Sequence, residues 1–288
     1  MVELEPQAQQ QAALEHAARH LGVADGAEQD RVVAADLEAV RAAPGVIAVL
    51  TADDIPGVND CSPSVGGDPI LADGQIAYHG QPVFAVVAET REAARRASLL
   101  ARIEITAETP AVTVEDAVAS KTRDVGEPYA FARRDVKLAL RTAASTLTES
   151  FRIGGQEHFY LEGQVSIALP EEHGAMTVLV STQHPTEVQH LVARMLGIAD
   201  AQVTCECRRM GGAFGGKESQ AAQWACLAAL AAHRTGRPAK CRLDRDDDMI
   251  MTGKRHDFRV DYTAGFDRKG RLAAVDVDDF AMMLDGRD

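Results

Sequence analysis

Residues 209–218 have the sequence Arg-Met-Gly-Gly-Ala-Phe-Gly-Gly-Lys-Glu and lie between a strand-like stretch and a long Ala-rich segment. Glycine tolerates positive φ and lets the backbone come close to a ligand, so this stretch predicts a sharp turn. Residues 203–209 before it have the pattern of a strand, and residues 219–234 after it that of a helix. The order strand, turn, helix predicts an α/β fold with a ligand site at the turn, where the free N–H groups of the helix start favour an anion.

A nucleotide-binding phosphate loop is one alternative for this turn, because Gly211 to Lys217 match the pattern GxxxxGK. That pattern continues with Ser or Thr, which holds magnesium. Glu218 stands there instead and would add negative charge beside the phosphates. The glycine spacing also differs from the GxGxxG dinucleotide fingerprint. We therefore expect a different ligand, although the spacing alone leaves open a turn that binds nothing.

The rest of the chain has strand-like and helical segments joined by short links, which predicts a mixed α/β protein. Helices are expected at 7–21, 89–101, 186–196 and 219–234, and a loop at 56–74. Strands are expected at 46–50, 82–87, 102–105, 147–153, 163–169, 176–182, 203–209 and 239–244, with a hairpin at 258–265 and 271–280. A polar stretch over 118–135 predicts a boundary between two domains, one on each side, that do not share one sheet. Residues 1–31 remain unassigned.

The composition excludes several classes of function. A net charge of −13 argues against binding to nucleic acid or to an anionic membrane surface. The five cysteines, at 61, 205, 207, 226 and 241, include no CxxC pair, which argues against an iron–sulfur cluster in this chain and against a disulfide framework. With no secretory signal and no apolar run of about 18 residues, the expected location is the cytoplasm.

Several segments in order carry a family resemblance. GGAFGGKES at 211–219, GGQEHFYLEGQ at 154–164, Ser181-Thr-Gln183 and DRDDDM at 244–249 are similar to motifs of the xanthine dehydrogenase and aldehyde oxidase family. PGVIAVLTADDIPG at 44–57 and HGQPVFAVVAET at 79–90 resemble its small α/β hammerhead domain. The resemblance covers roughly residues 32–279. It implies a hammerhead-like domain over 32–118 and the first part of a molybdopterin-binding domain over 130–288.

The resemblance also implies a cofactor, in which a pyranopterin holds molybdenum and the protein supplies hydrogen bonds. Gln183, Gly212, Phe214 and Gly215 match the cofactor-binding positions, with Gln183 and the Phe214 backbone nearest the metal. By composition alone, Gln183 would be a solvent-facing residue at the end of a strand. Glu218 matches the position that binds a purine, where aldehyde-oxidising relatives have an apolar residue. Without the motif, Glu218 would be a glutamate favoured by the dipole of the following helix.

Other charged residues near these motifs have structural explanations. His158 could be a core histidine, and Glu157 and Glu162 are expected to be hydrogen-bonded packing residues. Lys217 could neutralise a cofactor phosphate or be solvated. The aspartates at 244, 246 and 248 resemble the opening of a calcium loop, but the glycine and glutamate that such a loop requires are missing.

The expected function is therefore that of a molybdopterin-dependent oxidoreductase, with hydroxylation of xanthine or hypoxanthine to urate favoured. The family's general-base glutamate, its substrate-orienting arginine and its second glycine-rich segment match nothing here, so no catalytic residue is expected in this chain. Iron–sulfur and FAD centres are expected on a partner subunit, beside the remaining part of the molybdenum subunit. A fragment, a truncated gene or a frame-shifted product would explain the missing motifs. An aldehyde or other heterocycle hydroxylase, or a non-catalytic remnant, stays open.

Overall fold

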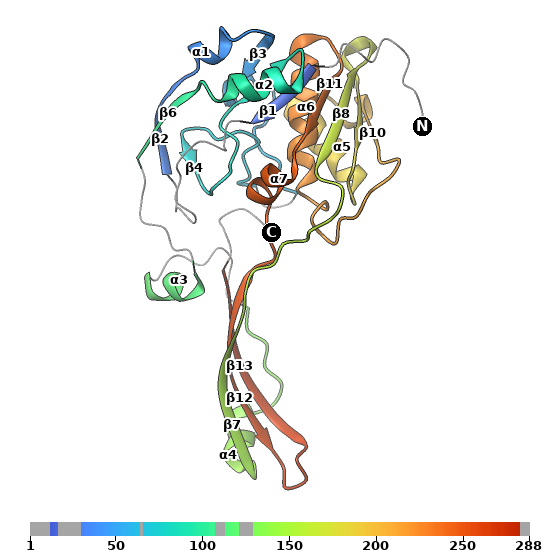
Figure 1. Cartoon of the computed structure of the whole chain (residues 1–288). Coiled ribbons are helices and arrows are strands. Elements are labelled where there is room, and N and C mark those ends of the chain that lie inside the picture. Colours follow the sequence, from blue (N-terminus) through green and yellow to red (C-terminus); the bar gives the residue numbers. More distant parts are fainter. Residues whose placement is uncertain (1–11, 17–29, 64–65, 107–112, 121–128, 283–288) are drawn as a thin grey trace. The chain divides into compact units, whose positions relative to one another are not determined.

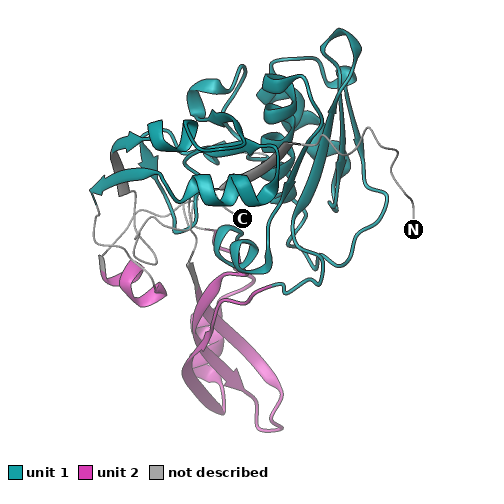
Figure 2. Cartoon of the chain, turned by 45° about the horizontal axis from the view of Figure 1, so that its top comes forward, with its two compact units in different colours: residues 1–110, 158–253, 286–288 teal, residues 111–157, 254–285 magenta. Residues whose placement is uncertain are grey.

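The computed structural model describes residues 12–16, 30–63, 66–106, 113–120 and 129–282 (Figure 1). The chain forms two compact units that interleave along the sequence (Figure 2). Unit 1 comprises residues 1–110, 158–253 and 286–288, and unit 2 comprises residues 111–157 and 254–285.

A seven-stranded mixed sheet forms the centre of unit 1, in the order β10-β9-β8-β11-β1-β5-β3. Its strands are β1 (Ala12–His16), β3 (Val46–Leu50), β5 (Ala85–Ala88), β8 (Val165–Pro170), β9 (Met176–Val180), β10 (Val203–Glu206) and β11 (Ala239–Arg242). β10 runs parallel to β9 and β1 runs parallel to β11, while the other neighbours are antiparallel. A smaller sheet in the order β4-β2-β6 contains β2 (Asp30–Asp36), β4 (Gln75–Ile76) and β6 (Arg102–Thr106).

The larger sheet includes strands from both segments that the sequence divides at 118–135. β3 and β5 come from the first segment, and β8 to β11 come from the second. β1 joins them, because its two edges pair with β5 and with β11. The expectation that the two segments would not share a sheet is therefore wrong. Two sheet edges that would otherwise be unpaired are satisfied by the one strand between them.

The helices of unit 1 are α1 (Glu38–Arg41), α2 (Arg91–Ser98), α5 (Pro185–Leu196), α6 (Ala221–Thr235) and α7 (Arg245–Met251). Single 3-10 turns occur at Ala52–Asp54, Glu172–Gly174 and Asp200–Gln202. Local sequence explains where the longer helices begin and end. The Thr90 side chain accepts a hydrogen bond from Ala93 N–H at the start of α2. Proline at the first position favours the start of α5, and a left-handed glycine follows its last residue.

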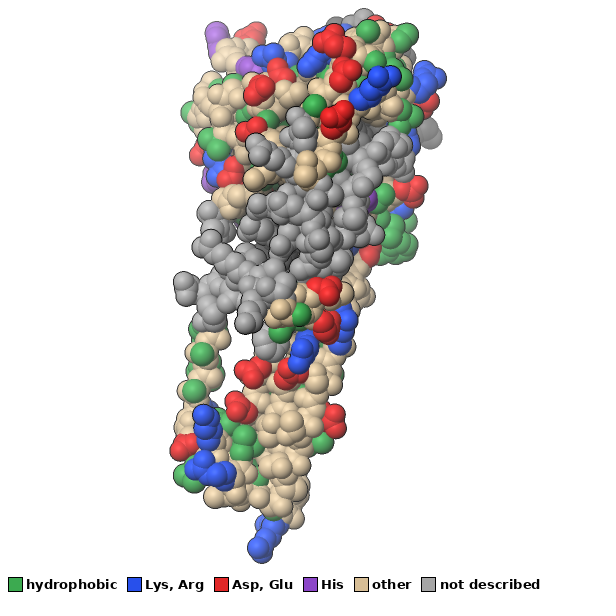
Figure 3. All heavy atoms as spheres, turned by 90° about the vertical axis from the view of Figure 1, so that its left-hand side faces the viewer, with side chains coloured by type: hydrophobic (Ala, Val, Ile, Leu, Met, Phe, Trp, Pro, Cys, Tyr) green, Lys and Arg blue, Asp and Glu red, His purple; other side chains and the backbone are tan. Residues whose placement is uncertain are grey.

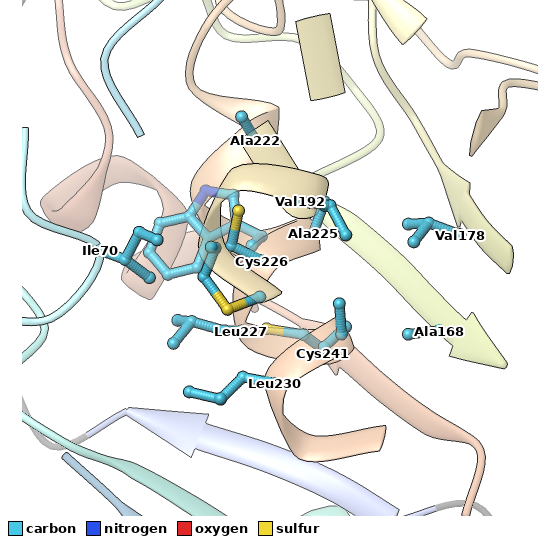
Figure 4. Packing of buried hydrophobic residues seen from close by; sticks show 14 of the residues in the cluster. Ile70, Ala168, Val178, Val192, Ala222, Ala225, Cys226, Leu227, Leu230 and Cys241 are labelled. Atoms are coloured by element: carbon cyan, nitrogen blue, oxygen red, sulfur yellow. The ribbon is translucent and has the colours of Figure 1, made fainter. Parts of the chain in front are cut away.

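The main core of unit 1 is built around α6. Every residue from Ala221 to Ala232 is buried, so this helix contacts protein on all sides. Its small alanine side chains let α5 and the sheet approach closely. Figure 4 shows Cys226, Leu227 and Leu230 of α6 among side chains of the neighbouring helix and strands, which include Val192, Val178, Ala168 and Cys241. Cys226 and Cys241 are buried in this core and pack as small hydrophobic residues.

Unit 2 is a three-stranded antiparallel sheet with two short helices. The strands, in the order β13-β12-β7, are β7 (Ser145–Ile153), β12 (Asp257–Phe266) and β13 (Leu272–Met282), and the helices are α3 (Val114–Ser120) and α4 (Val136–Thr142). The predicted hairpin is confirmed as β12 and β13. Arg152 connects this sheet to α3, because it pairs with Asp257 at 2.5 Å and with Glu115 at 3.0 Å.

Some expectations from the sequence fail at the level of single elements. The helix predicted over 7–21 is wrong at residues 12–16, which form β1, while its other residues lie outside the described part. Pairing with two strands overrides the helical preference of its Ala, Leu and Glu residues. Four short helices were not predicted: α1, α3, α4 and α7.

Two surface properties bear on function. Among the residues that the structure describes, no helix is long and apolar enough to cross a bilayer. On the face of unit 1 shown in Figure 3, acidic and basic side chains are interspersed. The negative net charge is therefore not gathered into one patch on that face.

Candidate functional site

The glycine-rich turn has the bent backbone that its sequence predicts. Gly212 and Gly215 have φ of 97° and 94°, and Phe214 between them has φ of 56°. Gly216 lies so close to the loop before β8 that a Cβ there would meet Tyr160 at 2.6 Å and His158 at 2.8 Å. Only glycine fits at this position without displacing the loop.

Gln183, directly after β9, binds the turn through its side-chain oxygen. Oε1 accepts hydrogen bonds from Gly215 N–H at 3.1 Å and from Lys217 N–H at 3.3 Å, while the Gln183 N–H donates to Lys217 O at 2.9 Å. With its oxygen occupied, the amide has its two N–H donors left for a ligand. The exposed Gln183 side chain would therefore recognise a hydrogen-bond acceptor.

Phe214 offers a second donor from the same turn. Within the described part of the chain, no hydrogen bond uses the Phe214 N–H, which lies one residue from the N–H that binds Gln183. Its side chain is 76% exposed. A bulky residue in this backbone conformation is strained, by roughly 1–3 kcal/mol, and such strain occurs preferentially at binding sites. The turn and Gln183 thus present adjacent donors to a ligand.

Glu218 lies beyond the turn and before the helix. α6 begins at Ala221, two residues later than predicted, and Gln220 is its N-cap. Glu218 therefore precedes the first helical turn and is exposed. Its side chain makes no hydrogen bond or ion pair with the residues that the structure describes. A carboxylate in this setting is open to a ligand, but among the described residues no hydrogen bond joins it to Gln183.

Lys217, at the end of the turn, forms an ion pair with half-buried Glu162. Lys217 is fully buried, and its ammonium donates to Glu162 Oε2 at 3.1 Å and to Ser181 Oγ at 2.9 Å. The ring of Tyr160 lies 4.8 Å from the same nitrogen. Lys217 is thus neither solvated nor free to neutralise a phosphate, which corrects both expectations for it.

Glu162 accepts three hydrogen bonds on one oxygen. The donors are Ser181 Oγ at 2.5 Å, Gly211 N–H at 2.9 Å and Lys217 Nζ at 3.1 Å. Partial burial acts to raise the pKa of this carboxyl, but the bonds from Gly211, Ser181 and Lys217 outweigh it and lower the pKa below its usual value. Glu162 therefore stays ionised at neutral pH. Its contacts support the structural role expected for it.

A second, buried hydrogen-bond network joins the loop before β8, at residues 160–164, to α7. Tyr160 donates its hydroxyl proton to Asp248 Oδ1 at 2.5 Å, and Gln164 N–H donates to Asp248 Oδ2 at 2.6 Å. Burial and the hydrogen bond to Asp248 raise the pKa of Tyr160 well above its usual value. The Gln164 side chain reaches the turn, where its Nε2 donates to Gly216 O at 2.9 Å. Asp248, on α7, is thus a buried acceptor of hydrogen bonds from Tyr160 and Gln164.

The structure brings most of the predicted cofactor residues together. Gln183 and Gly215 are in direct contact, and Gly212 and Phe214 belong to the same turn. The sequence did not indicate the pairing of Lys217 with Glu162, which lie far apart in the chain. Among the described residues, no group of His, Cys, Asp or Glu side chains could hold a metal ion directly.

Two family models match most of the chain. Residues 119–283 match the model of the molybdopterin cofactor-binding domain, and residues 27–109 match the model of the aldehyde oxidase and xanthine dehydrogenase a/b hammerhead domain. The chain belongs to the xanthine dehydrogenase and aldehyde oxidase family. The resemblance inferred from the motifs is thereby confirmed, and so is the expected mixed α/β fold.

The similar proteins include both xanthine dehydrogenases and an aldehyde oxidase. It is 40% identical over 240 residues to the xanthine dehydrogenase of Dictyostelium discoideum, and 37% identical over 252 residues to aldehyde oxidase 2 of Macaca fascicularis. These alignments cover 83% and 86% of the chain, but 18% of each relative's length. The aldehyde oxidoreductase of Desulfovibrio gigas has the same fold, with a TM-score of 0.80 at 22% identity over 95% of this chain and 31% of that one.

Proposed function

We propose that this chain supplies part of the cofactor and substrate site of a molybdenum hydroxylase that acts on a purine. The observation that carries the proposal is the arrangement of Gln183 on the 211–217 turn. It leaves the Gln183 amide N–H groups and the Phe214 N–H available to acceptor atoms of one ligand. The cofactor, when bound, would supply the centre that oxidises a ring carbon.

The chain's own residues would hold and orient that cofactor. The backbone of Gly212, Phe214 and Gly215 can come close to it because glycines on both sides carry no side chain that interferes. Gln183 would donate to an oxygen near the metal, and backbone donors fixed in place in this way bind without rearrangement. No residue of this chain is proposed to act as the general base.

Glu218 supports a purine as the substrate. Its carboxyl group can bind ring nitrogen and exocyclic groups of an oxopurine, and it is exposed and makes no hydrogen bond or ion pair with the residues that the structure describes. A second candidate is the oxidation of an aldehyde or of another heterocycle. We keep this second candidate because an aldehyde oxidase is 37% identical to the chain, close to the 40% of a xanthine dehydrogenase.

The chain would act within a larger assembly. It spans 16–19% of the length of the curated relatives it matches. We propose that the remaining part of the molybdenum site and the iron–sulfur and FAD centres lie outside the 288 residues, and that the assembly is cytoplasmic.

Metal and pterin analysis of the purified chain tests the cofactor assignment. In Gln183→Glu, one oxygen can still accept from Gly215 and Lys217, but a charged oxygen replaces the amide donors. We expect molybdenum and pterin to copurify with the original chain and to fall sharply in this variant. Gln75→Glu, an exposed change on β4, is the matched control. A chain that carries neither molybdenum nor pterin would support a non-catalytic remnant instead.

A further inference from the structure

One carboxylate connects both ends of the glycine-rich turn. Glu162 Oε2 accepts from the N–H of Gly211, at the start of the turn, and from the ammonium of Lys217, at its end. Ser181, which directly follows β9, gives the same oxygen a third donor. This one oxygen therefore links three segments that are distant in sequence, at residue 162, residue 181 and the 211–217 turn.

The charge of Glu162 matters as much as its hydrogen bonds. The Lys217 side chain is 0% exposed, and Glu162 is its ion-pair partner in the described part of the chain. A buried ammonium is strongly unfavourable without an opposite charge. Glutamine at position 162 could still accept hydrogen bonds, but it could not neutralise Lys217. Loss of the charge would therefore drive Lys217 toward solvent and move the end of the turn with it.

Movement of Lys217 would reach the candidate site directly. The Lys217 N–H donates to Gln183 Oε1, and the Lys217 carbonyl accepts from Gln183 N–H and from Thr182 Oγ at 3.1 Å. The same residue thus carries the buried charge on its side chain and the contact to Gln183 on its backbone. In sequence, Phe214 lies between Gly211 and Lys217, the two residues of the turn that Glu162 binds.

We propose that Glu162 and Lys217 are positioning residues that set where the Phe214 N–H and the Gln183 amide meet the cofactor. They act through the turn and do not touch the ligand. The proposal rests on the proposed function for its ligand, but the hold of the pair on the turn can be measured without any ligand.

A double-mutant cycle in the 288-residue chain tests this role. The variants are Glu162→Gln, Lys217→Met and the combination of both, with amide hydrogen exchange followed by mass spectrometry. In Glu162→Gln we expect the amides of 211–217 to exchange at least about tenfold faster, since the counter-charge of the fully buried Lys217 ammonium is removed. The amides of α6 should change much less. In the combined variant the turn should recover most of its protection, because no buried charge remains.

The control is Glu92→Gln, which breaks an exposed ion pair with Arg96 on α2 and should leave the turn unchanged. Molybdenum content, measured on the same samples, should fall in Glu162→Gln and recover in the combined variant. Unchanged exchange of 211–217 in Glu162→Gln, or an equal rise in the turn and in α6, would overturn the positioning role. If the turn responds but the original chain carries no molybdenum, the pair's hold on the turn stands and the proposed function fails.

Discussion

At the scale of single residues, some groups of the candidate site could be predicted from the sequence and others could not. The glycines at 211–216 indicated the turn because few other residues could form it, and Gln183 and Phe214 were found through their motifs. The buried state of Lys217 was not predicted, because a lysine next to a flexible turn is usually solvated. Its partner Glu162 lies on another loop, and sequence spacing does not indicate a contact between segments that only the fold brings together.

The lowered pKa of Glu162 predicts how the turn responds to acid. The ordinary pKa of this carboxyl is 4.5, and its value in the folded chain is lower. Its contribution to stability is therefore complete above pH 4.5 and is lost as the pH falls through the folded-state pKa. We expect the amide proton shift of Gly211, followed by NMR, to titrate with a midpoint below 4.5. In Glu162→Gln this titration should vanish. A midpoint at or above 4.5 would contradict the charge-stabilised arrangement.

Glu218 predicts a change in substrate selectivity. The test uses a chimaera in which residues 32–279 replace the matching segment of the Dictyostelium discoideum xanthine dehydrogenase. Glu218→Val should lower kcat/KM for xanthine by about 10- to 100-fold, the value of one hydrogen bond to a charged group. Molybdenum content should not change, and Glu218→Gln should lose less. Unaltered xanthine kinetics in the valine variant would remove Glu218 from the substrate site.

At the scale of elements, prediction succeeded where an element has a strong local pattern. α5 and α6 have clear helical composition and end at glycines, and β12 and β13 flank a turn of Asp, Lys and Gly residues. Elements with four to seven residues, such as α1 and α7, offer too few positions for a periodic pattern. β1 failed for another reason, since its partners on both edges come from distant parts of the chain.

The sheet of unit 2 is expected to be less stable than α6. Among the buried hydrophobic residues of the described chain, only Val114 and Ala264 belong to unit 2. The register places Leu147, Phe151 and Val277 on one face, where they are 43%, 47% and 51% exposed. Amides of β7 and β12 should therefore exchange roughly 100-fold or more faster than those of α6. Equal protection of the two would show that this face is covered in solution, for example by a second copy of the chain.

At the scale of the whole molecule, the order of strands could not be derived from local sequence. The pattern identified most strands, but it did not show that β1 joins β5 to β11. Pairing between distant strands is a property of the assembled sheet, and residues 12–16 have no feature that names their partners. The family motifs were informative at this scale, because their order along the chain indicated both the hammerhead domain and the cofactor-binding domain.

The 288-residue chain by itself is expected to show no xanthine oxidation. The proposed function places the general base outside these 288 residues, and a positioned base of this kind contributes about 10²–10⁴-fold to a reaction rate. The donors that the structure describes on the 211–217 turn and at Gln183 lie close together, and the proposal assigns the other contacts of the cofactor to the remaining part of the molybdenum subunit. Urate formation, followed by its ultraviolet absorbance with an artificial electron acceptor, measures the activity, and the chimaera serves as the positive control. Robust turnover by the isolated chain would mean that one of its own residues serves as the base. Exposed Glu218, the carboxylate nearest the turn without a partner among the described residues, would then be the first residue to replace.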